Sequence, residues 1–133
     1  MSAAPLKIMI VDDEPPIRKL LRMGLSTQGY DILEAPNGKI ALDLLGQGPA
    51  LIILDLGLPV GDGFVVLDRL QNSDALAGIP VIVLSARDPQ TNEERALKAG
   101  AAAFFQKPAD NEELLSVIRV SLPQPKAEAA RPS

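Results

Sequence analysis

Short runs of apolar residues alternate along the chain with segments in which apolar residues recur every three or four positions. A continuous apolar run is typical of a strand buried on both faces, whereas the wider spacing is typical of an amphipathic helix. The runs predict five strands, at residues 6–11, 30–34, 51–54, 81–84 and 102–105. The spaced segments predict five helices, around residues 17–25, 40–45, 66–70, 92–99 and 114–122.

The expected strands and helices alternate and are joined by short connections. This order favours a parallel sheet with helices on both faces, and right-handed crossovers with one reversal of strand order complete a doubly wound α/β fold. The functional crevice of such a sheet lies beyond the carboxyl ends of its strands. Because glycine readily adopts the left-handed conformation that ends many helices, Gly29, Gly46 and Gly100 mark three expected helix ends.

The pattern covers residues 6–122, which predicts one domain preceded by a short tail at residues 1–5. Residues 123–133 hold three prolines and no large apolar side chain, as is typical of a linker or tail. The apolar run before Asp55 is far shorter than the roughly 20 residues of a membrane span, and no basic segment precedes an apolar signal region. We therefore expect a cytoplasmic protein that does not bind membranes.

The composition narrows the available chemistry. The chain contains neither Cys nor His, which excludes disulfides, thiolate nucleophiles, imidazole general bases and zinc sites of the Cys or His type. The 13 basic and 17 acidic residues give a net charge of −4, which disfavours direct binding to nucleic acid. Reactivity must therefore come from carboxylates, hydroxyls, Lys, Arg or the backbone.

Polar residues follow four of the expected strands. Asp12-Asp13-Glu14 follows the first strand, Asp55 the third, Ser85 the fourth and Lys107 the fifth. Since the carboxyl ends of parallel strands meet at one edge of the sheet, we expect these groups to converge. Clustered carboxylates repel one another unless a cation intervenes, and Mg²⁺ takes one or two carboxylates together with phosphate and water. A carboxylate held beside Mg²⁺ and a Lys can attack phosphorus and form an acyl phosphate.

Each of these residues also has a simpler explanation. Asp13 can be the N-cap of the helix that follows it, which has proline in its first turn. Asp55 can close an Asx turn, and Ser85 can be an ordinary turn hydroxyl. Lys107 can be a solvated surface residue. The combination of these residues, rather than any one of them, favours a phosphoryl site.

Six short motifs stand in order along the chain. They are Ile10-Val11-Asp12-Asp13-Glu14, Leu51-Ile52-Ile53-Leu54-Asp55-Leu56, Leu58-Pro59 with Gly61-Asp62-Gly63, Pro80-Val81-Ile82-Val83-Leu84-Ser85-Ala86, Ala99-Gly100-Ala101 and Lys107-Pro108. Together they resemble the receiver domain of two-component response regulators, over about residues 6–122. The resemblance implies a flavodoxin-like three-layer sandwich whose five-stranded parallel sheet has the order 2-1-3-4-5.

The resemblance implies a role for each residue of the cluster. Asp55 is expected to accept a phosphoryl group from a histidine kinase or a His-containing phosphotransfer protein. Asp13, Asp55 and the backbone carbonyl of Gly57 are expected to bind Mg²⁺ directly, and Asp12 to bind it through a water molecule. Lys107 is expected to pair with the phosphoryl group.

The resemblance also implies a switch and an output surface. Ser85 and Phe104 occupy the hydroxyl and aromatic switch positions, so that movement of the hydroxyl toward the phosphoryl group gives the ring space to rotate. We name the helix around 92–99, the strand at 102–105 and the helix around 114–122 the C-terminal face. Clustered apolar residues there predict a homodimer contact or an output partner. These residues are Ala101, Ala102, Ala103, Phe105, Val117 and Val120.

Some positions bear on what kind of receiver this is. Ala102 and Ala103 replace an acidic pair that a group of DNA-binding regulators uses in charged dimer contacts, so that form of dimer is not expected. Gly57 and Arg87 are unable to orient a water molecule for attack, which predicts slow autodephosphorylation. The chain is thus expected to be a phosphoacceptor switch rather than an enzyme. The Lys107-Pro108 peptide is expected to be cis, as in the family.

Three other functions stay open. A phosphatase or phosphomutase with the same nucleophile commonly carries a second Asp two residues later, where this chain has Gly57. A nucleotide or flavin binder on this fold would carry a glycine-rich phosphate loop after the first strand, and neither of the usual loop motifs occurs there. A pseudo-receiver, which binds partners without phosphorylation, is disfavoured because the acidic residues, the hydroxyl and the Lys are all present.

Overall fold

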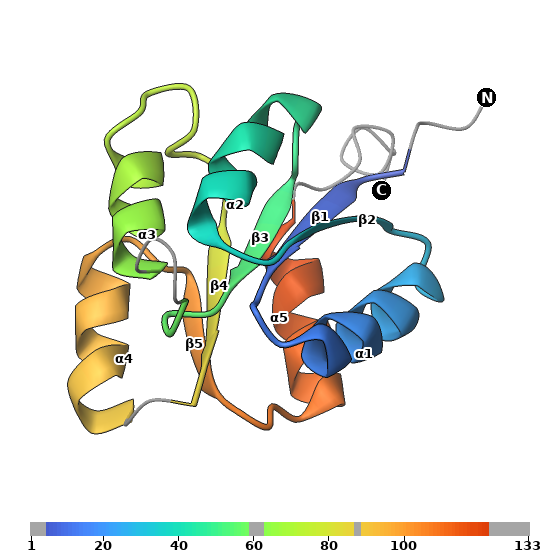
Figure 1. Cartoon of the computed structure of the whole chain (residues 1–133). Coiled ribbons are helices and arrows are strands. Elements are labelled where there is room, and N and C mark those ends of the chain that lie inside the picture. Colours follow the sequence, from blue (N-terminus) through green and yellow to red (C-terminus); the bar gives the residue numbers. More distant parts are fainter. Residues whose placement is uncertain (1–4, 59–62, 87–88, 123–133) are drawn as a thin grey trace, which may run out of the picture.

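The computed structural model describes residues 5–58, 63–86 and 89–122, in which strands and helices alternate (Figure 1). The strands are β1 (Lys7–Val11), β2 (Asp31–Ala35), β3 (Leu51–Leu54), β4 (Val81–Ser85) and β5 (Ala103–Gln106). The helices are α1 (Pro15–Ser26), α2 (Gly38–Leu44), α3 (Gly63–Gln71), α4 (Pro89–Lys98) and α5 (Asn111–Ser121), with a short 3₁₀ helix, η1 (Leu45–Gln47), after α2. Some of the features expected from the sequence lie outside the described residues. These are most of the tail at 1–5, the tail at 123–133, Pro59, Gly61, Asp62 and Arg87.

The five strands form one parallel sheet in the order β2-β1-β3-β4-β5. This order confirms the doubly wound, flavodoxin-like architecture. Val11 is paired in register with Leu54, so β1 and β3 end at the same level. The residues that follow these two strands are therefore brought side by side at the carboxyl edge of the sheet.

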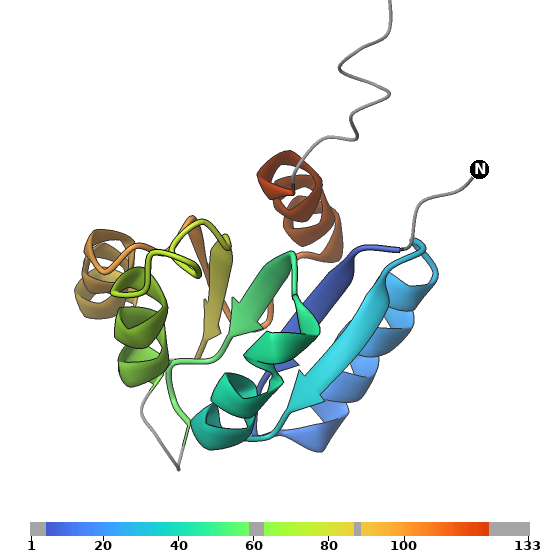
Figure 2. The ribbon, with the colours of Figure 1, turned by 90° about the horizontal axis from the view of Figure 1, so that it is seen from above.

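The helices divide between the two faces of the sheet, as Figure 2 shows for α3 and α5 on opposite sides. On one face, a buried apolar cluster joins the sheet to α2, α3 and α4, through residues such as Ala41, Phe64 and Ala96. On the other face, a second cluster joins it to α1 and α5, through Leu25 and Ile118 among others. Both sides of β3 are thus covered, which explains why all four of its residues are apolar and buried.

Local signals in the sequence set the helix starts. Prolines occupy the first positions of α1, where the missing backbone N–H has no partner to lose. The side chain of Asn37 accepts a hydrogen bond from the Ile40 N–H at the start of α2, and Asp110 accepts one from the Glu113 N–H at the start of α5. The first turn of α4 includes Pro89, three residues before the start expected from the apolar pattern.

Two of the three expected glycine helix ends are confirmed. Gly29 follows α1 with φ of 91°, and Gly100 follows α4 with φ of 109°. The expectation for Gly46 is wrong, because α2 ends at Leu44 and the chain tightens into η1. The left-handed residue is Gly48, with φ of 75°, which caps that extra turn. Among the described residues, no helix has both the length and the apolar character needed to cross a membrane.

Candidate functional site

The turn from β1 into α1 holds Asp12 in a buried position. The Asp12 N–H donates to the Ala35 carbonyl at 3.1 Å, which continues the pairing of β1 with β2 past the end of the strand. The Asp12 Oδ1 atom accepts a hydrogen bond from the Glu14 N–H at 2.9 Å. Glu14, not Asp13, is the N-cap of α1, and its side chain makes no capping bond. The simpler explanation of Asp13 as a helix cap is therefore wrong, and its carboxylate stands exposed at the site.

Asp55 is held beside Asp12 by the sheet itself. Its N–H donates to the Val11 carbonyl at 2.9 Å, and its Oδ1 atom accepts a hydrogen bond from the Gly57 N–H at 3.0 Å. The side chain thus closes an Asx turn, as the simpler explanation supposed. The turn uses the Oδ1 atom and leaves Oδ2 pointing in another direction, so Asp55 can close the turn and also take part in the acidic cluster.

Gly63, the first residue of α3, packs directly against the backbone of Asp55. A Cβ atom at Gly63 would lie 2.6 Å from both the Asp55 carbonyl oxygen and the Leu56 Cα atom. Side-chain atoms essentially never approach backbone that closely, so this position requires glycine. The start of α3 therefore fixes the backbone that follows β3.

Lys107 joins the two aspartates from the far side of the site. The backbone N–H of Lys107 donates to the Ser85 carbonyl at 2.9 Å, which extends the pairing of β4 with β5. The Lys107-Pro108 peptide is cis, as expected. The Nζ atom of Lys107 lies 2.8 Å from Asp12 Oδ2, 2.9 Å from Glu14 Oε1 and 3.4 Å from Asp55 Oδ2. The side chain is 11% exposed, so the explanation as a solvated surface Lys is wrong.

The site gathers more negative than positive charge. Carboxylate oxygens of Asp12, Asp13, Glu14 and Asp55 lie within 4.8 Å of one another, and Lys107 is the cation in contact with three of these four groups. A set of hard oxygen donors with uncompensated charge suits a hard divalent cation such as Mg²⁺. The donor set at the carboxyl edge therefore fits the metal expected from the sequence.

The pKa values of Asp12 and Lys107 are both raised, which favours the neutral form of Asp12 and the charged form of Lys107. Loss of solvation raises the pKa of Asp12 above its usual value, although hydrogen bonds from Lys107 and the Glu14 N–H act against this. Burial alone would lower the pKa of Lys107, but hydrogen bonds to Asp12 and Glu14 and the charges of Asp12 and Asp55 raise it. The two groups differ in the number of oppositely charged partners, because Lys107 faces several carboxylates whereas Asp12 faces one ammonium.

Ser85 and Phe104 lie on the same face of the sheet. Val83 is paired with Phe104 and Ser85 with Gln106, so Ser85 is the diagonal neighbour of Phe104 along β4 and β5. Ser85 is fully buried, whereas Phe104 is half-buried and packs on the cluster beneath α2, α3 and α4. Phe105 packs on the opposite cluster. The two switch positions are therefore adjacent, as a coupling between them requires.

The C-terminal face consists of α4, β5 and α5, and its residues are less uniform than the sequence indicated. Val120 is 79% exposed and Ala102 is also exposed, as expected for a contact surface. Ala101 is buried in the apolar cluster that joins the sheet to α2, α3 and α4, so its assignment to this surface is wrong. The left-handed turn at Gly100 is followed by a hydrogen bond from the Ala101 N–H to the Ala96 carbonyl, which accompanies this inward placement.

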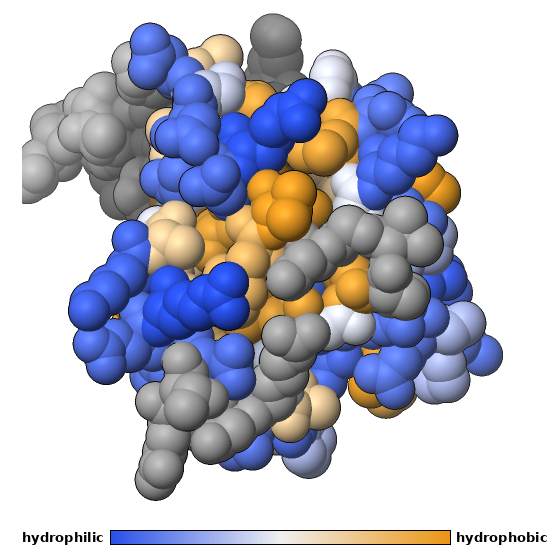
Figure 3. All heavy atoms as spheres, turned by 60° about the vertical axis from the view of Figure 1, so that its left-hand side comes forward, coloured by the Kyte–Doolittle hydropathy of each residue, from blue (hydrophilic) through white to orange (hydrophobic). Residues whose placement is uncertain are grey.

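An apolar area also lies over α3 and α4. Figure 3 shows this face, where hydrophobic residues gather in the middle and hydrophilic residues surround them. The guanidinium of Arg95 on α4 stacks over the Phe64 ring on α3, 3.7 Å from its centroid. This contact joins the two helices across a shallow hollow that Val65 and Asp68 also line.

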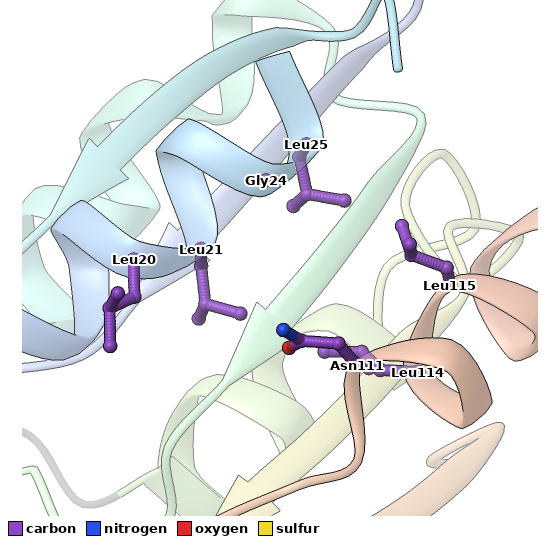
Figure 4. A pocket seen from close by; sticks show the side chains of 7 residues that line it. All are labelled: Leu20, Leu21, Gly24, Leu25, Asn111, Leu114 and Leu115. Carbon is purple, nitrogen blue, oxygen red and sulfur yellow. The ribbon is translucent and has the colours of Figure 1, made fainter. Parts of the chain in front are cut away.

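A second hollow lies between α1 and α5 on the other side of the sheet (Figure 4). Its volume is about 70 Å³, far below the roughly 300–1,000 Å³ of small-molecule sites. This hollow therefore gives no support to the alternative of a nucleotide or flavin binder. The side chains around it are Leu20, Leu21, Leu25, Asn111, Leu114 and Leu115.

Two participants of the site were not assigned a role from the sequence. Glu14 pairs with Lys107, a residue 93 positions away. Arg18 donates from Nη1 to the Asp12 carbonyl at 2.7 Å. Arg18 is the fourth residue of α1, and its closeness in sequence to the turn after β1 is a signal that could have indicated this contact.

Comparison with known proteins places the chain in a family. The sequence profile described as the response regulator receiver domain matches residues 8–119. The DNA-binding dual master transcriptional regulator RpaA of Synechocystis is 38% identical over 117 residues, which are 87% of this chain and 48% of RpaA. The KDP operon transcriptional regulatory protein KdpE of Escherichia coli is 40% identical over 124 residues, which are 92% of this chain and 54% of KdpE. The chain thus spans about half the length of these relatives.

Solved structures agree with the sequence relatives. The chemotaxis protein CheY4 of Vibrio cholerae superposes with a TM-score of 0.81 at 26% identity, over 90% of this chain and all of that one. The BeF₃-activated N-terminal receiver domain of Klebsiella pneumoniae RstA gives a TM-score of 0.80 at 28% identity, over 89% of this chain and 99% of that one. Fold, sequence profile and relatives agree, and the chain belongs to the family of response regulator receiver domains.

Proposed function

We propose that this receiver takes a phosphoryl group from the phosphohistidine of a histidine kinase, or of a His-containing phosphotransfer protein, onto Asp55. The observation that supports this most directly is the convergence of the Asp55 carboxylate with three further acidic groups and Lys107 at the carboxyl edge of the sheet. Asp55 is also the carboxylate that Lys107 holds least closely, at 3.4 Å against 2.8 Å for Asp12. Its Oδ2 atom is therefore the more available for reaction.

The acidic cluster would hold Mg²⁺ during this transfer. Asp13, Asp55 and the backbone carbonyl of Gly57 are the proposed direct ligands, and Asp12 is proposed to act through a bound water. The bound cation would neutralise charge on the phosphoryl oxygens and on the carboxylates around them. The exposure of Asp13 supports this assignment, because its carboxylate has no capping bond to give up.

The residues of the chain supply positioning and charge in the transfer. A carboxylate oxygen of Asp55 forms the new bond to phosphorus while the bond from phosphorus to the donor imidazole nitrogen breaks, so the products are an acyl phosphate and the free donor His. The ammonium of Lys107 would turn from the carboxylates toward the phosphoryl oxygens and stabilise the negative charge on those oxygens. The absence of His in this chain is consistent with a step that needs no general base of its own.

Phosphorylation of Asp55 would be read out through Ser85 and Phe104. The Ser85 hydroxyl would donate to a phosphoryl oxygen, a charge-assisted bond that forms only in the phosphorylated state. Its movement would give Phe104, its diagonal neighbour, space to turn inward from its half-buried position. Such a link typically carries about 1–3 kcal/mol of coupling.

The C-terminal face is the proposed output surface. It would bind a second copy of the chain or an output partner, because Ala102 and Val120 are exposed there. Direct contact of this domain with nucleic acid is not proposed, since the net charge is −4, although RpaA is described as DNA-binding and is about twice as long. A cytoplasmic location, where the kinase core of such systems acts, follows from the same proposal.

The phosphorylated state is proposed to be long-lived. Gly57 offers no side chain to orient an attacking water, and Arg87, the other position on which this expectation depends, lies outside the described residues. The domain would thus assist its own phosphotransfer without turning over as an enzyme does. Following the decay of the acyl phosphate in Mg²⁺ would check this, and a half-life of seconds would contradict it.

The decisive test is the intact mass of the protein after incubation with acetyl phosphate or phosphoramidate, with and without Mg²⁺. We expect a gain of one phosphoryl group that requires Mg²⁺ and disappears in Asp55→Asn. Asp43→Asn, which changes an exposed carboxylate on α2, is the matched control and should behave like the wild type. If the wild type neither gains mass nor binds beryllofluoride, the protein is a pseudo-receiver and the proposal fails.

A further inference from the structure

Arg18 links the turn between β1 and α1 to the second strand of the sheet, β2. Its Nη1 atom donates to the Asp12 carbonyl at 2.7 Å, and its Nε atom donates to Glu34 Oε1 on β2 at 3.3 Å. The side chain is only 17% exposed. Glu34 also accepts from Arg22, one turn further along α1, at 2.7 Å. A single guanidinium therefore bridges a backbone carbonyl of the site and a carboxylate on a neighbouring strand.

We propose that Arg18 is a positioning residue, which fixes the Asp12 turn so that the carboxylates stand ready for the cation. This inference rests on the proposed function, because it concerns the same Mg²⁺ site. Arg18 touches neither the proposed phosphoacceptor nor a proposed direct metal ligand in any contact that the structure records. It acts through the backbone of Asp12.

The case for positioning begins with how Asp12 is held. Its side chain is fixed at both oxygens, by the Glu14 N–H at Oδ1 and by Lys107 at Oδ2. Its carbonyl is fixed by Arg18. Removing the guanidinium frees the peptide that joins Asp12 to Asp13, and Asp13 is a proposed direct ligand. Residues that orient metal ligands in this way commonly contribute about ten- to a hundredfold to metal affinity.

Arginine suits this place for a reason that lysine does not share. The planar guanidinium presents several N–H groups in fixed directions, so Nη1 and Nε can serve two acceptors at once. A Lys at position 18 would carry the same charge but offers a single nitrogen on a flexible stem. The two acceptors here come from different elements, the β1–α1 turn and β2, so the bridge depends on that geometry.

Charge alone predicts the opposite result, which makes the inference testable. A positive side chain near a cation site repels the cation, so removing it would tighten Mg²⁺ binding if its charge were all that mattered. Positioning predicts that removal weakens binding. The sign of the change in Mg²⁺ affinity therefore separates the two effects.

Arg22 is a matched control on the same helix. It shares the partner Glu34 with Arg18 and carries the same charge, but its recorded contact is with Glu34 and not with the Asp12 turn. Its side chain is 45% exposed, so its replacement disturbs little packing. Arg22→Met removes one charge from the vicinity of the site and leaves the bridge to Asp12 in place.

The experiment is calorimetric titration of Mg²⁺ into the wild type, Arg18→Met, Arg18→Lys and Arg22→Met. We expect Arg18→Met to weaken Mg²⁺ binding by about tenfold, Arg18→Lys to recover part of the loss and Arg22→Met to bind as the wild type or slightly more tightly. The inference is overturned if Arg18→Met binds Mg²⁺ as tightly as the wild type, or if Arg22→Met loses as much affinity.

A second readout needs no metal and keeps the inference separate from the proposed function. The Glu14 N–H, which closes the Asp12 turn, should exchange with solvent faster in Arg18→Met than in the wild type or Arg22→Met. The Ile40 N–H, which donates to the N-cap Asn37 Oδ1 at the start of α2, is the reference and should be unaffected. If the wild type binds no Mg²⁺, the proposed function fails, while unchanged Glu14 exchange overturns the role of Arg18.

Discussion

Asp12 and Asp55 stand side by side at the ends of β1 and β3 and are held in the same way. In each residue Oδ1 accepts the N–H of the residue two positions later, and Oδ2 faces the ammonium of Lys107. The contacts differ in length, at 2.8 Å for Asp12 and 3.4 Å for Asp55. Two chemically identical side chains in matching turns thus differ in how closely the cation engages them, which supports different roles for them.

The ionised form of Asp12 should reduce the stability of the metal-free protein. Burial raises its pKa, which means that the folded state disfavours the charge. Asp12→Asn keeps the Oδ1 acceptor for the Glu14 N–H and removes the charge, so we expect the free energy of unfolding at pH 7 to rise by about 1 kcal/mol. Urea unfolding followed by circular dichroism measures this, since the chain has no Trp. Saturating Mg²⁺ should favour the wild type instead.

The same pKa shift fixes the sign of the pH dependence. Between 3.8 and its raised value in the folded protein, Asp12 holds its proton more firmly in the folded than in the unfolded state. Its contribution to stability therefore falls as the pH rises through that window and is constant above it. The advantage of Asp12→Asn should grow from pH 3.8 upward. A variant that loses ground to the wild type over that interval would contradict the argument.

Replacing Lys107 should destabilise the fold. In Lys107→Met, the carboxyl groups of Asp12 and Asp55 remain buried without the ammonium that contacts them, at an expected cost of about 1–3 kcal/mol. Because the pKa of Lys107 is raised, this stabilisation is complete below pH 10.5, the ordinary pKa of Lys, and is lost only as the pH rises beyond it. The difference from wild type should be constant from pH 7 to 9, with part of it recovered in Mg²⁺. Lys39→Met, on exposed α2 surface, should change little.

Two glycines should respond to alanine in opposite directions. Gly63→Ala forces a Cβ against the Asp55 carbonyl, so we expect a loss of about 1–3 kcal/mol in unfolding free energy and slower phosphorylation of Asp55. Gly24, inside α1, has nothing within 4 Å of an added Cβ. Gly24→Ala should therefore gain about 0.5–1 kcal/mol from helix propensity. Equal effects of the two substitutions would show that the close approach at Gly63 is unimportant.

Ser85→Ala should separate phosphorylation from switching. We expect Asp55 still to be phosphorylated, while beryllofluoride binds about fivefold more weakly and no longer shifts the NMR signals of the Phe104 ring. Phe105 lies on the other face of the sheet and serves as an internal reference in the same spectra. A Phe104 response in Ser85→Ala as large as in the wild type would argue against the coupling.

The strands and the convergence of the site could be predicted from the sequence because both depend on local pattern. A run such as residues 51–54 is apolar throughout since both faces are covered, and a parallel sheet brings the residues after its strands to one edge. Glu14 could not be assigned a role in this way, because its partner Lys107 lies 93 positions along the chain and comes within reach only through the fold. The contact of Arg18 with Asp12 is local, but its link to Glu34 on β2 depends on the packing of α1 against the sheet.

The errors have equally local causes. Gly46 resembles a helix-ending residue, but the chain takes one tighter 3₁₀ turn, which moves the left-handed position to Gly48. The start of α4 was placed too late because its first turn carries no apolar residue to reveal the period. Ala101 was assigned to the surface because a small apolar residue fits either environment, and the geometry after Gly100 decides between them.

The sheet keeps its two apolar clusters apart, with Phe104 on the side of α2, α3 and α4 and Phe105 on the side of α1 and α5. Substitutions on opposite sides share few neighbours, so their effects on stability should add. The apolar residues beneath α1 and α5 can therefore change without disturbing the packing around Phe104, because the sheet separates the two clusters.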